Sequence, residues 1–332
     1  MISLGIETSC DDTAVGIVTS KHEILSQVKS SQDRVHSKWG GIVPELASRA
    51  HLENILPVVD MALKDANLTP QDIDIISVTY GPGLVGSLLV GIETAKALSL
   101  AWNKPLVGVN HLRGHVSSVM LANPELELPS LGLLVSGGHS EIVKFNPDFT
   151  LDLIAQTRDD ATGESLDKFG RVLGLPYPAG PVIDSMALSG NEDAFDFPST
   201  KLKDGSLDFS FSGLKTSGIR AAQSHPDIPK EDLAASFFKA AVDQLLDRLM
   251  TATVQLAPKS FFAVGGVASS KYLRQKLERF CDAMDLPLSI PPPNLCTDNG
   301  VMIAYCGLLY YRFGIKSSLG LQPVSRLPIT SV

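Results

Sequence analysis

Two stretches of this sequence share one layout and decide the fold: SLGIETSCDDTAVGIV at residues 3–18 and SLGLLVSGGHSEIVKF at residues 130–145. In each stretch, apolar β-forming residues flank a short turn of Ser, Thr, Gly or Asp. This pattern is typical of a β-hairpin whose tip is small and polar. The match predicts a duplicated architecture in which each half opens with a hairpin.

A second repeat follows each hairpin and strengthens the first. We expect the same order of strand, turn, helix, strand and helix in both halves, at residues 75–80, 81–83, 87–102, 106–109 and 111 onward, and at residues 261–264, 265–266, 271–284, 288–290 and 299 onward. Alternating strands and helices predict an α/β fold with a mostly parallel sheet in each lobe and ligands at the carboxyl ends of the strands. We expect lobes at residues 1–127 and 128–332 around a central cleft, and the last segment is a candidate to pack back on the first lobe.

Length and composition agree with two lobes in a soluble protein. At 332 residues the chain exceeds the roughly 150 residues of a usual domain, and 44% apolar and 19% charged residues can form ordinary cores. The N-terminus has no basic segment, and we find no apolar run long enough for a membrane span. Four cysteines without a C-x-x-C pair suggest no disulfide framework. We expect a cytoplasmic protein with no membrane contact.

The net charge of -8 argues against a protein that coats nucleic acid by bulk electrostatics. Any RNA would have to meet a local basic patch. Two segments are candidates: Lys29, Arg34 and Lys38, and Lys271, Arg274, Lys276 and Arg279. Solvated helix faces explain either segment equally well.

Three glycine- or serine-rich turns, at residues 9–13, 136–140 and 265–270, fall at equivalent places of the repeat. Turn amides and helix N-termini bind anions without side-chain charge, so these turns predict a phosphate site. The polar segments 158–190 and 209–218 between the repeats are predicted to be loops, and the first contains Asp167 and Asp184. These two carboxylates are either functional or simply solvated.

His111 and His115 in NHLRGHVSS are four residues apart, so a helix beginning near Asn110 would place both imidazoles on one face. Two such rings can chelate zinc or iron(II), although surface or capping histidines explain the pair without a metal. Asp298 begins the equivalent helix of the other half and is a candidate third ligand from across the cleft. Its alternative role is a helix N-cap.

The residues between the two histidines exclude a zinc protease, because the sequence lacks the Glu of H-E-x-x-H that would act as general base. His139 lies at a glycine-rich turn. It is a candidate donor to a substrate, and a structural histidine is the alternative.

Several motifs together resemble the universal tRNA threonylcarbamoyladenosine transferase family, called TsaD in bacteria. The resemblance covers essentially the whole chain, including the segment from Lys96 to Val116 that contains the histidine pair. The further matching motifs are ETSCDDT (7–13), GGIVPELASRAH (40–51), LVSGGH (134–139) and TDNGVMIA (297–304).

The resemblance implies a duplicated fold of the actin and Hsp70-like ATPase (ASKHA) type, with mixed sheets flanked by helices. It implies that His111, His115 and Asp298 bind iron(II) or zinc and that Asp11 lies close to the reaction centre. The residues it implies for substrate contact are Leu134, Val135, Ser136, Gly137, Gly138, Asp167, Gly180 and Asp184. One position departs from the family: the motif GGVxxN usually ends in Asn, and Ser270 stands at that place here. The Ser hydroxyl cannot make both of the hydrogen bonds that an Asn side-chain amide makes.

The implied reaction transfers a threonylcarbamoyl group from threonylcarbamoyl-AMP to the exocyclic amine of the adenosine beside the anticodon in ANN-decoding tRNAs. We hypothesise that the metal polarises or orients the carbamoyl group while Asp11 accepts or steers the amine proton. An ATP- or ADP-type nucleotide is a further candidate for the cleft. Implied partners are tRNA, a TsaB-like paralogue, a TsaE-like ATPase and, for the chain alone, a second copy of itself. The alternatives are a sugar or carboxylate kinase and a non-catalytic partner subunit.

Overall fold

The computed structural model describes residues 1–199, 202 and 204–332. The chain divides into two compact units, Met1–Pro124 with Thr297–Val332, and Glu125–Cys296. Residues 297–332 therefore belong to the first unit, as expected for a last segment that packs back on the first lobe. The predicted boundary at residue 127 taken alone would have assigned them to the second lobe. The reason is helix α11 (Gly300–Arg312), which packs along the sheet of the first unit.

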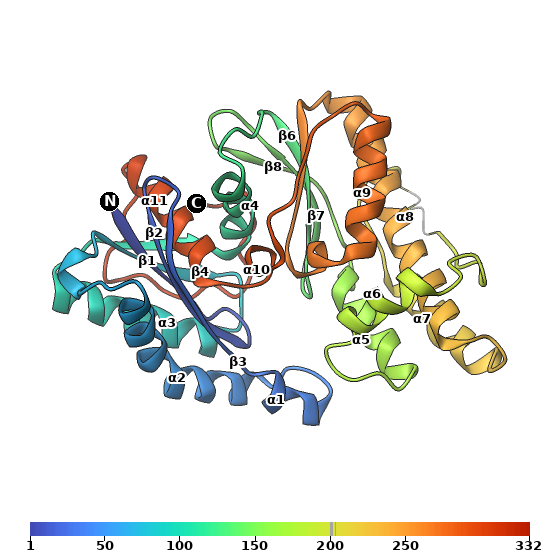
Figure 1. Cartoon of the computed structure of the whole chain (residues 1–332), viewed down its shortest axis with the longest axis horizontal. Coiled ribbons are helices and arrows are strands. Elements are labelled where there is room, and N and C mark those ends of the chain that lie inside the picture. Colours follow the sequence, from blue (N-terminus) through green and yellow to red (C-terminus); the bar gives the residue numbers. More distant parts are fainter. Residues whose placement is uncertain (200–201, 203) are drawn as a thin grey trace. The chain divides into compact units, whose positions relative to one another are not determined.

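The first unit is built around a five-stranded sheet with the order β3-β2-β1-β4-β5 (Figure 1). Helices α2 and α3 contact each other and the sheet, and α11 contacts strands β1, β2, β4 and β5. The elements are β1 (Ile2–Glu7), β2 (Asp12–Thr19), β3 (Ile24–Ser31), α1 (Asp33–His36), η1 (Ser37–Trp39), α2 (Pro44–Asp65), η2 (Pro70–Asp72), β4 (Ile75–Gly81), α3 (Val85–Trp102), β5 (Leu106–Asn110), α4 (His111–Ala122) and α11.

The alternation of side chains along β1 sets the two faces of this sheet. Leu4 and Ile6 join the hydrophobic core with residues of α2 and α3. Gly5 lies on the opposite face, where a Cβ atom would come within 2.2 Å of the Ala304 nitrogen in α11. Because side chains alternate with a period of two, Glu7 lies on the same face as Gly5. This arrangement places a carboxylate on the face of the sheet that α11 covers.

The second unit repeats the topology with the strand order β10-β9-β6-β7-β8. Its core joins Leu133 and Ile142 of the sheet to Phe237 and Val242 of the long helix α8. The elements are β6 (Ser130–Val135), β7 (Ser140–Phe145), β8 (Leu151–Gln156), α5 (Thr162–Val172), α6 (Gly180–Ser189), α7 (Ser212–Ser224), α8 (Lys230–Leu256), β9 (Ser260–Val264), η3 (Gly266–Ser269), α9 (Lys271–Ala283), β10 (Leu288–Ser289) and α10 (Pro293–Cys296).

The predicted order of elements is confirmed, but two expectations were wrong. Only two of the four strand pairings in each sheet are parallel, because each hairpin continues into a third antiparallel strand, β3 or β8. The segments 158–190 and 209–218 are not irregular loops, since they contain α5, α6 and the start of α7. These helices form because each buries a few apolar residues against the core, such as Phe169 of α5 and Leu214 of α7.

Helix α3 has the length and apolar composition of a membrane span, although we expected no apolar run of that length. Its buried side chains Leu88 and Ile92 belong to the core of the first unit, and Glu93 and Lys96 form an ion pair on it. One such helix is weak evidence for a membrane span. One face of α3 packs against β4 and α2.

Candidate metal centre

Helices α4 and α11 begin next to each other in the first unit, and each has an asparagine N-cap. Asn110 Oδ1 accepts from the Leu112 amide at 3.0 Å, and Asn299 Oδ1 accepts from the Met302 amide at 2.8 Å. Gly114 lets the helices approach closely, since a Cβ atom there would lie 2.9 Å from Cδ1 of Ile303. The N-cap role is therefore filled by Asn299, and Asp298, one residue earlier, is not the cap.

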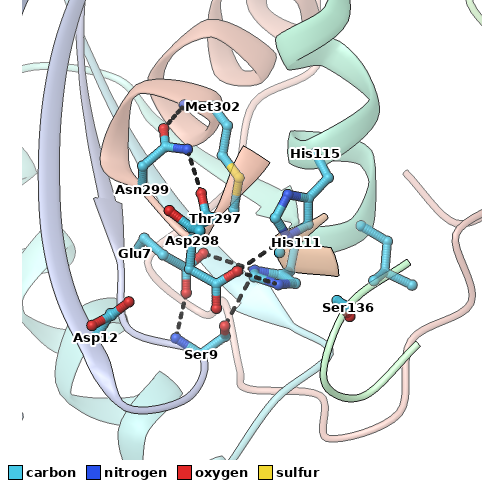
Figure 2. Close-up of polar contacts among 12 residues, drawn as sticks. Glu7, Ser9, Asp12, His111, His115, Ser136, Thr297, Asp298, Asn299 and Met302 are labelled. Atoms are coloured by element: carbon cyan, nitrogen blue, oxygen red, sulfur yellow. Dashed lines mark hydrogen bonds and ion pairs between the residues drawn. The ribbon is translucent and has the colours of Figure 1, made fainter. Parts of the chain in front are cut away.

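His111, His115 and Asp298 point at one another (Figure 2) and offer ligand atoms that all lie within 4.8 Å of one another. Asp298 Oδ1 is 3.1 Å from Nε2 of His115 and 3.6 Å from Nε2 of His111. Two imidazole nitrogens and one carboxylate form the ligand set of 2-His-1-carboxylate sites, which leave coordination positions open. The three residues therefore fit a divalent metal ion, and all three belong to one unit rather than to two facing lobes.

A second layer of polar residues holds His111 from behind, and of these only Ser9, in the predicted phosphate turn at residues 9–13, had an expected role. Nδ1 of His111 lies 2.9 Å from Oε2 of Glu7 and 3.2 Å from Oγ of Ser9. Thr79 donates its hydroxyl to Oε2 of Glu7 at 2.5 Å. The signal for Glu7 was present in the sequence, as an acidic residue that ends an otherwise apolar strand. Such a residue is buried at a cost unless it is paired.

Charge rather than burial controls protonation at this centre. Burial favours neutral forms, but the charges of Glu7 and Asp298 outweigh it and raise the pKa of His111 to about 9. Burial would also raise the pKa of Asp298, but the two histidines hold it well below its usual range. An incoming cation therefore competes with the proton on His111 for the same negative charge.

Asp11 lies in the turn between β1 and β2, and Asp12 is the first residue of β2. Burial and the charge of Asp298 raise the pKa of Asp11, and burial raises the pKa of Asp12 to about 6 although Lys29 pairs with it at 2.9 Å. His51 of α2 supports the turn, because its Nε2 donates to the Cys10 carbonyl and its Nδ1 accepts from Thr13. Lys29 of the first basic segment is thus committed to an ion pair.

The predicted phosphate turns of the second unit, and Gly180 at the start of α6, leave open space in front of their backbones. A Cβ atom at Gly137, Gly138, Gly180 or Gly266 would meet nothing within 4 Å. Gly265 is different, since its φ of 92° and a Val135 oxygen 2.4 Å from its Cβ position both require glycine. His139 closes the first turn, where its carbonyl accepts from the Ser136 amide at 2.8 Å.

The remaining predicted substrate residues have structural contacts of their own. Leu134 and Val135 are fully buried in β6, so their side chains are not accessible. Asp167 lies on α5 and accepts from the Ala179 amide at 2.7 Å, and Asp184 of α6 accepts from the Ser270 hydroxyl at 2.6 Å. Neither carboxylate is a solvated loop residue, and Ser270 also caps α9. The second basic segment is partly engaged as well, since Lys276 pairs with Glu192 at 2.8 Å.

Comparison with solved structures defines the class of fold. The (R)-2-hydroxyglutaryl-CoA dehydratase component A of Acidaminococcus fermentans matches with a TM-score of 0.56 and 12% identity over 94% of this chain and 99% of its own. T. kodakarensis HypF matches with a TM-score of 0.63 and 15% identity over 94% of this chain and 48% of its own. The chain therefore has the duplicated actin and Hsp70-like ASKHA fold, here with a candidate metal centre in its first unit.

Sequence comparison identifies the family within that class. Residues 23–305 match the model of TsaD, tRNA N6-adenosine threonylcarbamoyltransferase. Proteins of that name from Thermosipho africanus and Staphylococcus haemolyticus are 47% and 44% identical, over 99% and 98% of this chain and 100% and 96% of their own lengths. The chain belongs to the tRNA N6-adenosine threonylcarbamoyltransferase family. It is therefore a transferase that acts in tRNA modification, as its motifs implied.

Proposed function

We propose that the chain transfers the threonylcarbamoyl group of threonylcarbamoyl-AMP to N6 of the adenosine beside the anticodon in ANN-decoding tRNAs. The observation that carries this proposal is the cluster of His111, His115 and Asp298, which offers three ligand atoms. Sites of this 2-His-1-carboxylate type keep coordination positions open for further ligands. When bound, the divalent ion, iron(II) or zinc, supplies Lewis-acid stabilisation of the carbamoyl oxygen.

Asp11 is the proposed acceptor of the amine proton. Burial and neighbouring carboxylates raise its pKa, which makes its ionised form a stronger base than an ordinary aspartate. Asp11→Asn should therefore lower turnover at least tenfold while leaving metal content unchanged. Turnover within a few-fold of the unsubstituted protein would show that Asp11 is only a turn residue.

The second unit is the proposed site for the adenylate. Gly137, Gly138, Gly180 and Gly266 leave their backbone amides approachable, which suits the phosphate of AMP or of an ATP- or ADP-type nucleotide. We propose that Asp167 and Asp184 position the N-terminal ends of helices α6 and α9 at this site. His139 is the proposed donor to the departing phosphate. Gly137→Val should weaken binding of AMP, measured by calorimetry, without changing bound metal.

Replacement of both His111 and His115 by Ala tests the metal assignment. Bound metal in anaerobically purified protein and modified nucleoside on unmodified tRNA should both be lost. His225→Ala is the matched control, because His225 is exposed at the end of α7 in the other unit. Full transfer by metal-free protein would refute the proposed role of the ion.

The proposed protein partners are a TsaB-like paralogue and a TsaE-like ATPase, with a homodimer when the chain is alone. The outer surface of α2 supports an apolar contact, since Leu52 and Leu56, four residues apart on this helix, are 71% and 60% exposed. Patches of this kind mark interaction sites. Leu52→Glu combined with Leu56→Glu should abolish the complex with the paralogue in size-exclusion chromatography.

Val254→Glu is the control for that pair, because Val254 is 76% exposed on α8 of the other unit. A complex that survives the double substitution would place the partner elsewhere.

We also propose that the chain works in the cytoplasm and that its turnover without partners is weak, since the net charge of -8 disfavours tRNA binding by the chain alone. Turnover that does not change when partners are titrated in would contradict this.

A further inference from the structure

Glu7 is a fully enclosed carboxylate at the end of β1, with 1% of its surface exposed. Its Oε1 accepts from the Ser9 amide at 2.5 Å, and its Oε2 accepts from the Thr79 hydroxyl at 2.5 Å. The third neighbour is Nδ1 of His111, 2.9 Å from Oε2 (Figure 2). Every contact is therefore of the kind that an ionised carboxylate makes as an acceptor.

These contacts determine which nitrogen of His111 carries hydrogen. To bind a cation, His111 must be a neutral imidazole, which has one N–H. Because an ionised carboxylate can only accept, that hydrogen is on Nδ1. The lone pair is then on Nε2, which lies 3.6 Å from Asp298 Oδ1 on the side shared with His115. Without Glu7 the ring could adopt the other tautomer, whose Nε2–H cannot bind a cation.

Glu7 also changes the charge of the centre. A divalent ion held by two neutral imidazoles and Asp298 leaves one uncompensated positive charge. His115 is completely buried and His111 is 7% exposed, so solvent compensates that charge poorly. The negative charge of Glu7, one hydrogen bond behind the ring, brings the summed charge of the ion, its three ligands and Glu7 to zero. The two contributions of Glu7, orientation and charge, favour the bound ion together.

We propose that Glu7 is a positioning residue of the metal centre: it presents Nε2 of His111 to the ion and neutralises the loaded site. This inference rests on the proposed metal site and adds a residue that does not itself bind the ion. His115 differs from His111, because no described residue hydrogen-bonds to its Nδ1. The orienting contact is therefore specific to His111.

Zn²⁺ affinity, measured by competition with a chromogenic chelator, tests the proposal. In Glu7→Gln one side of the amide must present an N–H group either to the Ser9 amide or to His111, so both the charge and the fit are lost. We expect affinity to fall about 10- to 100-fold. Thr79→Val is the matched control, because it removes a donor to the same oxygen but keeps the carboxylate and its contact with His111. It should bind Zn²⁺ within about threefold of the unsubstituted protein.

Equal affinity of Glu7→Gln and the unsubstituted protein would overturn the inference while leaving the metal site intact. Failure of the unsubstituted protein to bind Zn²⁺ would instead overturn the proposed metal site. A measurement that needs no variant covers the case in which Glu7→Gln does not fold. In the Zn²⁺-loaded, ¹⁵N-histidine-labelled protein, His111 should show a protonated Nδ1 in long-range ¹H–¹⁵N spectra. A deprotonated Nδ1 there would refute the role of Glu7.

Discussion

Replacing Glu141 by Gln should stabilise the protein strongly at pH 8 and much less at pH 5. Glu141 lies on β7, where its neighbours across the sheet are Leu134 and Gln156. It is 7% exposed, and its Oε2 has no hydrogen-bond partner among the described residues. Burial raises the pKa of its carboxyl from 4.5 to about 7.

The size of the effect follows from that shift. Because the pKa of the Glu141 carboxyl rises on folding, the folded chain holds this proton more tightly than the unfolded chain does. Protonated Glu141 therefore favours the folded state below about pH 4.5. This contribution to the free energy of unfolding is lost as the pH rises toward 7. With these two values, ionisation of Glu141 costs the folded state about 1 kcal/mol at pH 5 and about 3 kcal/mol at pH 8. Gln cannot ionise, so the variant avoids the cost at both pH values.

Chemical unfolding at pH 5 and pH 8 measures the difference. The free energy of unfolding of Glu141→Gln relative to the unsubstituted protein should be about 2 kcal/mol more favourable at pH 8 than at pH 5. Any constant cost of burying the amide cancels in this comparison. Glu278→Gln on the exposed side of α9 is the control and should show no such change. A difference in free energy of unfolding between Glu141→Gln and the unsubstituted protein that is the same at both pH values would refute the reasoning.

Three further substitutions test the first unit. Gly300→Ala should destabilise it by about 3 kcal/mol or more in urea unfolding and lower bound metal, because the new Cβ would lie 2.1 Å from the Gly16 nitrogen; a change under 1 kcal/mol would contradict this close packing. Asn110→Asp keeps the cap of α4 but loses the two hydrogen bonds that the Asn110 amide donates to the Pro328 and Ser331 carbonyls. Proteolysis of the C-terminal tail should therefore become several-fold faster. An unchanged rate of proteolysis would contradict a role of this contact in holding the tail. His51→Phe should lower turnover more than metal content, because His51 supports the turn that carries Asp11; parallel loss of both would indicate general misfolding.

Much of the architecture could be predicted from local sequence. The hairpins at residues 3–18 and 130–145, the strands that follow and the helix of the histidine pair depend on side-chain periodicity and turn chemistry, which short windows record. The helices α5 and α6 were missed because their buried residues are few and interspersed with Gly and polar residues. Their stability comes from packing against a core formed by residues far away in the chain.

The sequence by itself determined the family, the duplicated fold and the three ligand types, because these are recorded in motifs and in spacing. Only the tertiary structure decided that Asp298 comes from the same unit as the histidines, since that depends on α11 returning to the first sheet, where glycines leave room for its backbone. Only the structure placed Glu7 behind His111. The two residues are far apart in the chain, and the contact exists because the alternation along β1 directs Glu7 to the face on which α4 and α11 begin.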